Sequence, residues 1–284
     1  MLHELHRNPA SAVARARPPQ ITDGIDSIGA ASGVANVIMQ LSWPEVGWGV
    51  RDSRVDSGNV YKHPLKRART TFQYLAVATV GSDEDKRLYR EAVDRVHRLV
   101  HSTPESRVKY SALDPKLQMW VAACLYVGFE DVFEWLHGPL TDADREAFYA
   151  SAHTLGTTLQ VRREQWPATR AEFDDYWRDG IARVRFDAPV AKHLVGLTEL
   201  RMLPQPATLL FGRINKWITT GFLHREFRDE LGLPWNPRDQ CRFEKFLAAT
   251  ARLNAMLPET IRTFSYRVLL MDLRWRMRTG RPLV

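Results

Sequence analysis

The chain has 284 residues, of which 44% are hydrophobic and 26% charged, and its formal net charge is +7 at pH 7. These proportions match an ordinary globular protein and exclude a globally disordered chain. The two cysteines, Cys124 and Cys241, exclude a disulfide scaffold and a cysteine-rich zinc module. The basic excess is compatible with nucleic acid or anionic lipid as a partner, but it requires neither.

Residues 1–21 are rich in arginine, proline and alanine, and they lack the apolar centre of a secretory signal. We expect them to form a disordered basic arm. No long linker divides the rest of the chain, so a single helical domain is expected over residues 22–284. No stretch is long and apolar enough for a transmembrane segment, and a soluble, cytoplasmic protein is therefore expected.

Helix signals are frequent along the chain, whereas strand signals are weak. The first predicted helix covers residues 26–42 and ends at Trp43-Pro44, and residues 45–62 are expected to form a loop. Proline, glycine and capping residues bound the helices that follow. These helices are predicted over 64–80, from Ser82, from Asp114-Pro115 to about residue 137, from Thr141, from Thr169, and over 187–200, 205–230, 237–255 and 258–278. The pattern predicts an all-α fold.

The segment EAVDRVHRLVH (91–101) contains the most informative histidine. Its valines and alanine mark one apolar helical stripe, and His97 lies on that stripe, so its imidazole is expected to point inward. His101 follows four residues later and is expected on the same face. A buried imidazole needs a hydrogen-bond partner or a metal. A core histidine bonded to a carbonyl is the simplest interpretation, and zinc is not favoured because the sequence places no third ligand.

The basic sequence KRARTT (66–71) lies at the start of the helix predicted over 64–80. Arg67 and Thr71 are four residues apart and therefore share one face of that helix. A solvated basic helix start is the simplest interpretation. Because positive charge near a helix N-terminus opposes the helix dipole, a functional contact with an anion or a cofactor is the alternative.

Four segments follow one another in a recognisable order. They are LSWPEVGWGVRDS (41–53), HPLKRARTTFQYLAVATVG (63–81), VHRLVHSTPESRVKYSALDPKLQMWV (96–121) and GLTELRMLPQP (196–206). Their order and spacing resemble the oxygenase family that contains MpaB-type enzymes and the catalytic domain of latex-clearing (rubber oxygenase) proteins.

This resemblance implies an all-α fold that encloses a haem-sized pocket with haem b. Counting back from Tyr110 and Asp114 along the family's pattern implies that His97 is the iron ligand. The family's arginine and threonine correspond to Arg67 and Thr71, which would contact the cofactor on its oxygen-binding side and act as catalytic residues. The implied reaction is the oxidation or cleavage of an apolar, lipid-like or isoprenoid-like substrate by O2.

The chain also departs from the family's pattern. Trp43 and Ala122 stand where many relatives have histidine, and Thr70 stands where latex-clearing enzymes have lysine. Rubber is therefore not the expected substrate. The alternative is a non-catalytic helical protein that kept the fold and binds haem or lipid. Nucleic-acid binding is not expected because no helix-turn-helix signal is present, whereas peripheral membrane contact is left open.

Overall fold

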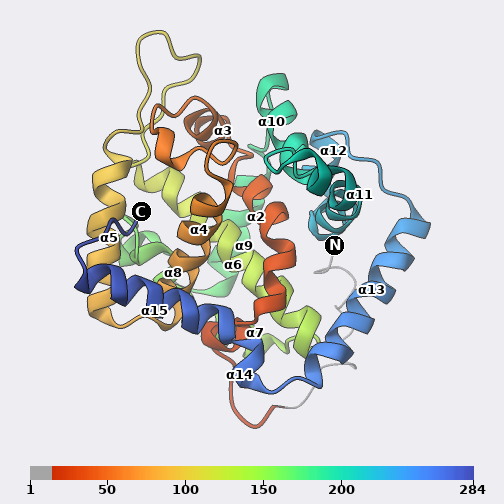
Figure 1. Cartoon of the computed structure of the whole chain (residues 1–284). Coiled ribbons are helices and arrows are strands. Elements are labelled where there is room, and N and C mark those ends of the chain that lie inside the picture. Colours follow the sequence, from red (N-terminus) through yellow and green to blue (C-terminus); the bar gives the residue numbers. More distant parts are fainter. Residues whose placement is uncertain (1–14) are drawn as a thin grey trace.

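The computed structural model of the chain describes residues 15–284, which form helices and, within that range, no β-strand (Figure 1). With η marking a 3-10 helix, the elements are η2 (Ile21–Gly24), η3 (Ser27–Ser32), α2 (Gly33–Gln40), α3 (Pro44–Arg51), η4 (Asp56–Gly58), α4 (Pro64–Val80), α5 (Asp83–His97), α6 (Pro115–His137), α7 (Asp142–Ala150), α8 (Thr154–Thr157), η5 (Arg163–Gln165), α9 (Arg170–Ile181), α10 (Ala188–Thr198), α11 (Gln205–Phe222), α12 (Arg225–Glu230), α13 (Pro237–Ala255), α14 (Glu259–Arg262) and α15 (Phe264–Arg278). The predicted all-α fold is confirmed.

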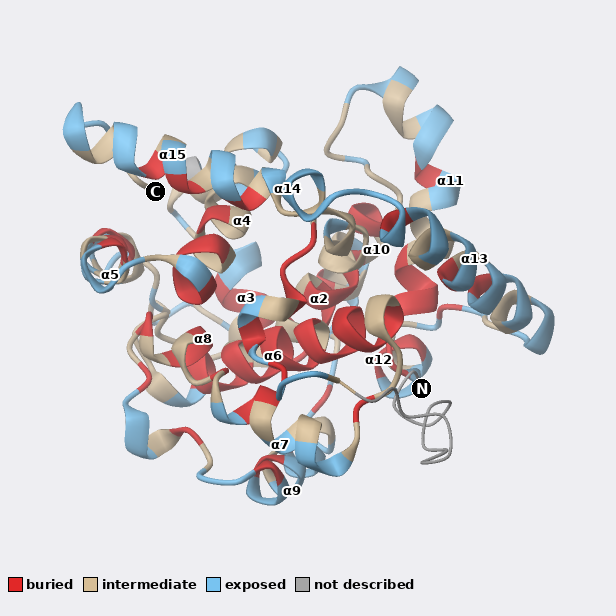
Figure 2. Ribbon diagram, turned by 90° about the horizontal axis from the view of Figure 1, so that it is seen from below, coloured by how far each residue is buried: buried red, intermediate tan, exposed pale blue. Residues whose placement is uncertain are grey.

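Helix α6 forms the centre of the fold, and Figure 2 shows it buried along most of its length. It contacts α2, α8 and α13, while α15 lies along α4. Asn36 of α2 donates a hydrogen bond from Nδ2 to the Cys124 carbonyl of α6 at 2.6 Å. A Cβ atom on Gly128 would lie 2.2 Å from that amide nitrogen, so glycine is required where α2 crosses α6.

Three indole rings stack in one of the two apolar clusters of the core. The ring centroids of Trp43 and Trp120 are 4.7 Å apart, and those of Trp120 and Trp177 are 5.1 Å apart. Trp43 donates from Nε1 to the Gly180 carbonyl at 3.0 Å. A Cβ atom on Gly180 would lie 2.4 Å from the Trp120 ring, so this stack also depends on a glycine. Trp43 and Trp120 are therefore core residues.

A buried network of charged side chains joins α6, α7 and α9. Arg170 lies 3.0 Å from Glu130, and Arg145 lies 3.2 Å from Glu130 and 2.6 Å from Glu134. The Tyr126 hydroxyl donates to Glu130 at 2.7 Å and accepts from Arg170 Nε at 3.1 Å. Both glutamates are almost fully buried. Their charges are stable inside the protein because each has a cationic partner.

The residues from which helix starts were predicted do cap those helices. Ser82 and Asp85 form a capping box, Thr141 accepts from the Asp144 amide, and Thr169 accepts from the Glu172 amide. The predicted bounds of α4 and α13 agree with the structure. Proline at N1 and a side-chain cap are thus strong local signals in this chain.

Several predicted boundaries are wrong. The helix predicted over 26–42 is divided into η3 and α2, and the loop predicted over 45–62 contains α3, because Pro44 begins a helix there. The helix predicted over 205–230 breaks at His224, whose Nε2 lies 2.9 Å from Asp131 Oδ2 of α6. The helix predicted over 258–278 breaks at Thr263 into α14 and α15.

Part of the predicted N-terminal arm, residues 1–14, lies outside the described residues, and the domain boundary at residue 22 stays a prediction. Arg15 lies 3.0 Å from Asp144 and donates to the Gly138 carbonyl at 3.0 Å, at the C-terminal end of α6. A cation at this position stabilises the free carbonyls of the helix end. Among the described residues, no helix is long and apolar enough to cross a membrane.

Asp85 connects α5 to α15, because Arg274 Nη2 lies 2.8 Å from its carboxylate. Desolvation opposes ionisation there, but the hydrogen bonds from Arg274 and Ser82 lower the pKa of Asp85 below its ordinary value of 3.8. A lowered folded-state pKa stabilises the fold above the unfolded value, and this contribution disappears as the pH falls through the folded-state pKa.

We therefore expect Asp85→Asn to lower the free energy of unfolding by about 1–2 kcal/mol near neutral pH, from the lost cap and hydrogen bonds. The difference from the unaltered protein should shrink below about pH 4, where Asp85 begins to be protonated in the unfolded chain. Urea denaturation at a series of pH values measures this difference in the free energy of unfolding. Asp83→Asn, which changes an exposed residue of the same helix turn, is the control. A difference that is the same at all pH values would contradict the ionic role of Asp85.

Candidate functional site

His97 is the last residue of α5, and its side chain is partly buried. The ring nitrogen Nδ1 is buried and has no hydrogen-bond partner among the described residues. A buried polar atom without a partner costs about 1–3 kcal/mol, so a natural protein rarely keeps one without a reason. The predicted inward direction of His97 agrees with this environment, but the expected carbonyl partner for Nδ1 is absent from the described part of the chain.

Arg67 and Thr71 lie one turn apart near the start of α4, which packs against α5. Neither side chain forms a hydrogen bond or an ion pair with any described residue. Thr70 differs, because its hydroxyl donates to the Arg67 carbonyl at 3.1 Å. Arg69 also differs, because its guanidinium lies 3.3 Å from Asp272 of α15. The KRARTT sequence therefore divides into Arg69 and Thr70, whose side chains have partners, and Lys66, Arg67 and Thr71, whose polar groups have none among the described residues.

The positive charge of Arg67 affects the pKa of His97. Desolvation lowers the pKa of His97 below its ordinary value of 6.5, and the positive charge of Arg67 lowers it further. Asp94, the Gln160 side chain and the Ala112 backbone act in the opposite direction. Because the lowering effects dominate, the neutral imidazole is favoured, which is the form that ligates metals.

Arg67 is an exposed residue, and desolvation by the surrounding protein lowers its pKa below its ordinary value. Arg67 forms no ion pair with a described residue, and the nearby Tyr89 donates its hydroxyl to the Thr70 carbonyl at 2.7 Å. The site thus combines an uncompensated cation with a neutral imidazole.

Two glutamines at this site were not identified from the sequence. Gln118 of α6 donates to the Ala112 carbonyl at 2.6 Å, and its Oε1 accepts from the Gln160 amide nitrogen of the backbone at 2.7 Å. The side-chain Nε2 of Gln160 and Oδ1 of Asp94 are buried without a partner, like Nδ1 of His97. Gln118 could have been identified from the sequence, because it is a polar residue one turn into a mostly apolar helix. Gln160 lies far from His97 and Gln118 in the sequence, and no local pattern identifies it.

The prediction that His101 shares a helix face with His97 is wrong. Helix α5 ends at His97, and His101 lies beyond it in an isolated bridge with Ser111. The side chain of His101 is exposed, and its Nδ1 lies 3.1 Å from the Ser102 carbonyl. Among the described residues, no group of three or more histidine, cysteine, aspartate or glutamate side chains is arranged to hold a metal ion.

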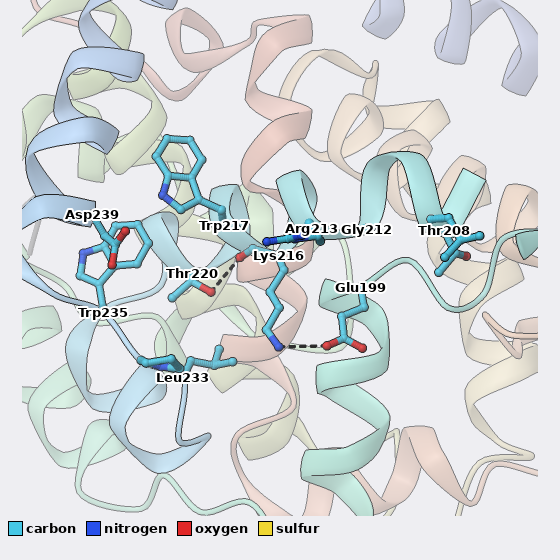
Figure 3. Close-up of a pocket in the computed structure, with 12 residues that line it drawn as sticks. Glu199, Thr208, Gly212, Arg213, Lys216, Trp217, Thr220, Leu233, Trp235 and Asp239 are labelled. Carbon is cyan, nitrogen blue, oxygen red and sulfur yellow. Dashed lines mark hydrogen bonds and ion pairs between the residues drawn. The ribbon is translucent and has the colours of Figure 1, made fainter. Parts of the chain in front are cut away.

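Two surface hollows lie elsewhere. The larger, of about 570 Å³, lies between α11 and the start of α13, and Figure 3 shows the Lys216–Glu199 ion pair of 2.9 Å together with Trp217 and Trp235 in its lining. The smaller, of about 430 Å³, includes His101. Neither is lined by His97, Arg67 or Thr71. The haem-sized pocket expected beside His97 stays a prediction.

Comparisons with known proteins agree with the sequence resemblance. A family model described as "ER-bound oxygenase mpaB/B'/Rubber oxygenase, catalytic domain" matches residues 24–253. Two uncharacterized proteins, one from Mycobacterium bovis and one from Mycobacterium tuberculosis, are each 51% identical to the chain over 250 residues, covering 88% of this chain and 98% of the relative. No solved structure matches the chain.

Proposed function

Because the chain belongs to the family of mpaB and rubber oxygenase catalytic domains, we propose that it is an oxygenase that holds haem b and acts with O2 on an apolar, lipid-like or isoprenoid-like substrate. The family supports oxygenase chemistry in general. The cofactor, the substrate and the residues that act on them are our proposal.

One observation carries this proposal: the buried ring nitrogen Nδ1 of His97 and the guanidinium of Arg67 have no hydrogen-bond or ion-pair partner among the described residues, and the charge of Arg67 lowers the pKa of His97. A buried ring nitrogen is normally satisfied by a protein group or by an ordered water. The donor set suits haem, because a neutral histidine can hold a b-type haem iron and a cationic group can stabilise negative charge that develops on oxygen. His97 would be the ligand.

Bound haem would supply the activation of O2, which no side chain of this chain can provide. His97 would hold the iron through one ring nitrogen, while Gln160 and the Ala112 backbone orient the other. Arg67 would donate hydrogen bonds to oxygen that becomes negatively charged, since its guanidinium stays protonated and is rich in donors. The Thr71 hydroxyl would donate a further hydrogen bond on the same face of α4.

The absorbance spectrum of the purified protein, and of haem-free protein titrated with hemin, tests the proposal. A Soret band with one-to-one stoichiometry, together with oxygen consumption in the presence of an unsaturated lipid or isoprenoid, is the expected result. Protein that neither contains haem nor takes up hemin contradicts the haem proposal. Haem without oxygen consumption would instead favour the non-catalytic alternative.

Arg67→Ala should leave the Soret band largely intact and slow the reaction with O2 by about 100-fold, as found when a donor to developing negative charge is removed. Arg95→Ala is the matched control, because Arg95 is an exposed arginine near the end of α5. Stopped-flow absorbance after mixing the reduced protein with O2 measures the rate. An unchanged rate in Arg67→Ala refutes the role given to this arginine.

A further inference from the structure

The outer face of α15 carries an exposed apolar stripe. Phe264, Val268, Met271 and Trp275 follow one another at spacings of four, three and four residues, and they are 63%, 42%, 69% and 44% exposed. This spacing places all four on one side of the helix. The opposite side packs on α4. Helix α15 is therefore apolar on two faces, and only one of them is covered.

The stripe continues into the segment that precedes α15. Leu257, just before α14, and Ile261 of α14 are also 45% and 54% exposed. We call the six residues Leu257, Ile261, Phe264, Val268, Met271 and Trp275 the α14–α15 surface. Figure 2 shows α14 and α15 along the upper edge of the molecule, and the exposed N-terminal half of α11 reaches the same edge. Several large exposed apolar side chains along one segment of this kind mark a site of interaction.

Basic side chains flank this surface on one side. Arg267 and Arg278 are exposed, and neither forms an ion pair with a described residue. Arg274 lies on the same flank and is partly neutralised by Asp85. The Arg281 guanidinium lies 4.4 Å from the centre of the Trp275 ring. An apolar stripe with aromatic residues and flanking arginines is typical of a helix that lies in the interface of a membrane.

The arrangement of charge distinguishes a lipid surface from a second copy of the chain. In an antiparallel pair of α15 helices, the flank that carries Arg267 and Arg278 would face the identical flank of the other copy. Like charges would then oppose one another across the contact. Anionic headgroups instead complement these arginines, and the acyl region accepts the apolar side chains.

We propose that the α14–α15 surface docks on membranes that contain anionic lipids. The protein would lie on the membrane without crossing it. Helix α4, which carries Arg67 and Thr71, lies directly under α15, so docking would bring the candidate site close to the lipid. The docking proposal stands on the surface alone and does not depend on haem or on oxygenase activity.

Co-sedimentation of the full chain with vesicles tests this proposal. Vesicles of phosphatidylcholine mixed with phosphatidylglycerol should bind the protein, vesicles of phosphatidylcholine alone should bind it much less, and added salt should weaken the binding. Because the chain has nine tryptophans, the Trp275 contribution is the difference in emission between the unaltered protein and Trp275→Phe, and this difference should shift to shorter wavelength on binding. The proposal is overturned if the anionic vesicles do not sediment the protein, or if both kinds of vesicle bind it equally.

Two variants locate the contact. Met271→Glu should reduce binding by at least about 10-fold, through loss of a buried apolar side chain. The double variant Arg267→Gln/Arg278→Gln should reduce it roughly 30-fold, at about 5-fold for each arginine. Leu99→Glu is the matched control, because Leu99 is 63% exposed beyond the C-terminal end of α5. Full binding by Met271→Glu, or a dimer in sedimentation equilibrium that Met271→Glu dissociates, contradicts membrane docking by this surface.

Discussion

His97→Ala is expected to abolish the uptake of hemin, whereas His101→Ala is expected to leave it unchanged. The two imidazoles differ in structure as well as in the proposed role. His97 is partly buried at the end of α5 with Nδ1 unpartnered, and His101 is exposed beyond the helix. Removal of the sole proposed protein ligand should lower hemin affinity by at least about 100-fold, since even residues that only support a ligand contribute 10–100-fold. Titration followed at the Soret band measures the affinity.

Loss of haem must be separated from loss of the fold. Circular dichroism should show the same helix content in His97→Ala and in the unaltered protein, because the substitution removes an unsatisfied polar group rather than a packed apolar one. Added imidazole should restore a Soret band to His97→Ala by filling the vacated position. A Soret band that survives in His97→Ala and disappears in His101→Ala would transfer the ligand to His101 and refute the present assignment.

Arg170→Ala is expected to destabilise the protein by about 3–5 kcal/mol, the usual result of breaking a buried ion pair. Arg170 contacts Glu130 and Tyr126 inside the network that joins α6 to α9. Its removal leaves the buried carboxylate of Glu130 with less compensation. A loss of this size is a large part of the stability of a typical domain.

The control for this prediction lies on the same helix. Arg178 pairs with Asp175 at 2.9 Å, but both side chains are about 70% exposed, at 71% and 70%. Arg178→Ala should therefore cost at most about 1 kcal/mol. Urea denaturation followed by circular dichroism compares the two variants. Equal effects of Arg170→Ala and Arg178→Ala would show that burial does not set the strength of this network.

Local signals in the sequence were sufficient for most helix boundaries. Capping side chains and proline at N1 act within one helix turn, so they fix the starts of α4, α6 and α13 without information from the rest of the chain. The break before α12 could not be found in this way. It coincides with the contact of His224 with Asp131, which lies 93 residues earlier.

The candidate site was only partly predictable for the same reason. Periodicity placed His97 inward, and the family pattern selected Arg67 and Thr71, each from residues close in sequence. Gln160 reaches the site because the chain after α8 returns to α6, where Gln118 accepts its backbone amide at 2.7 Å. The misplacement of His101 arose from extending the helical period past the point where the chain pairs with Ser111.

The central position of α6 has a consequence for how the molecule unfolds. One side of this helix supplies Tyr126 and Phe133 to one apolar cluster, and another side supplies Trp120 and Trp135 to the second. Each cluster therefore loses its contacts with α6 if the other cluster unfolds. We therefore expect the two apolar clusters to unfold together in a single cooperative transition. Neither cluster is expected to stay folded as a separate fragment.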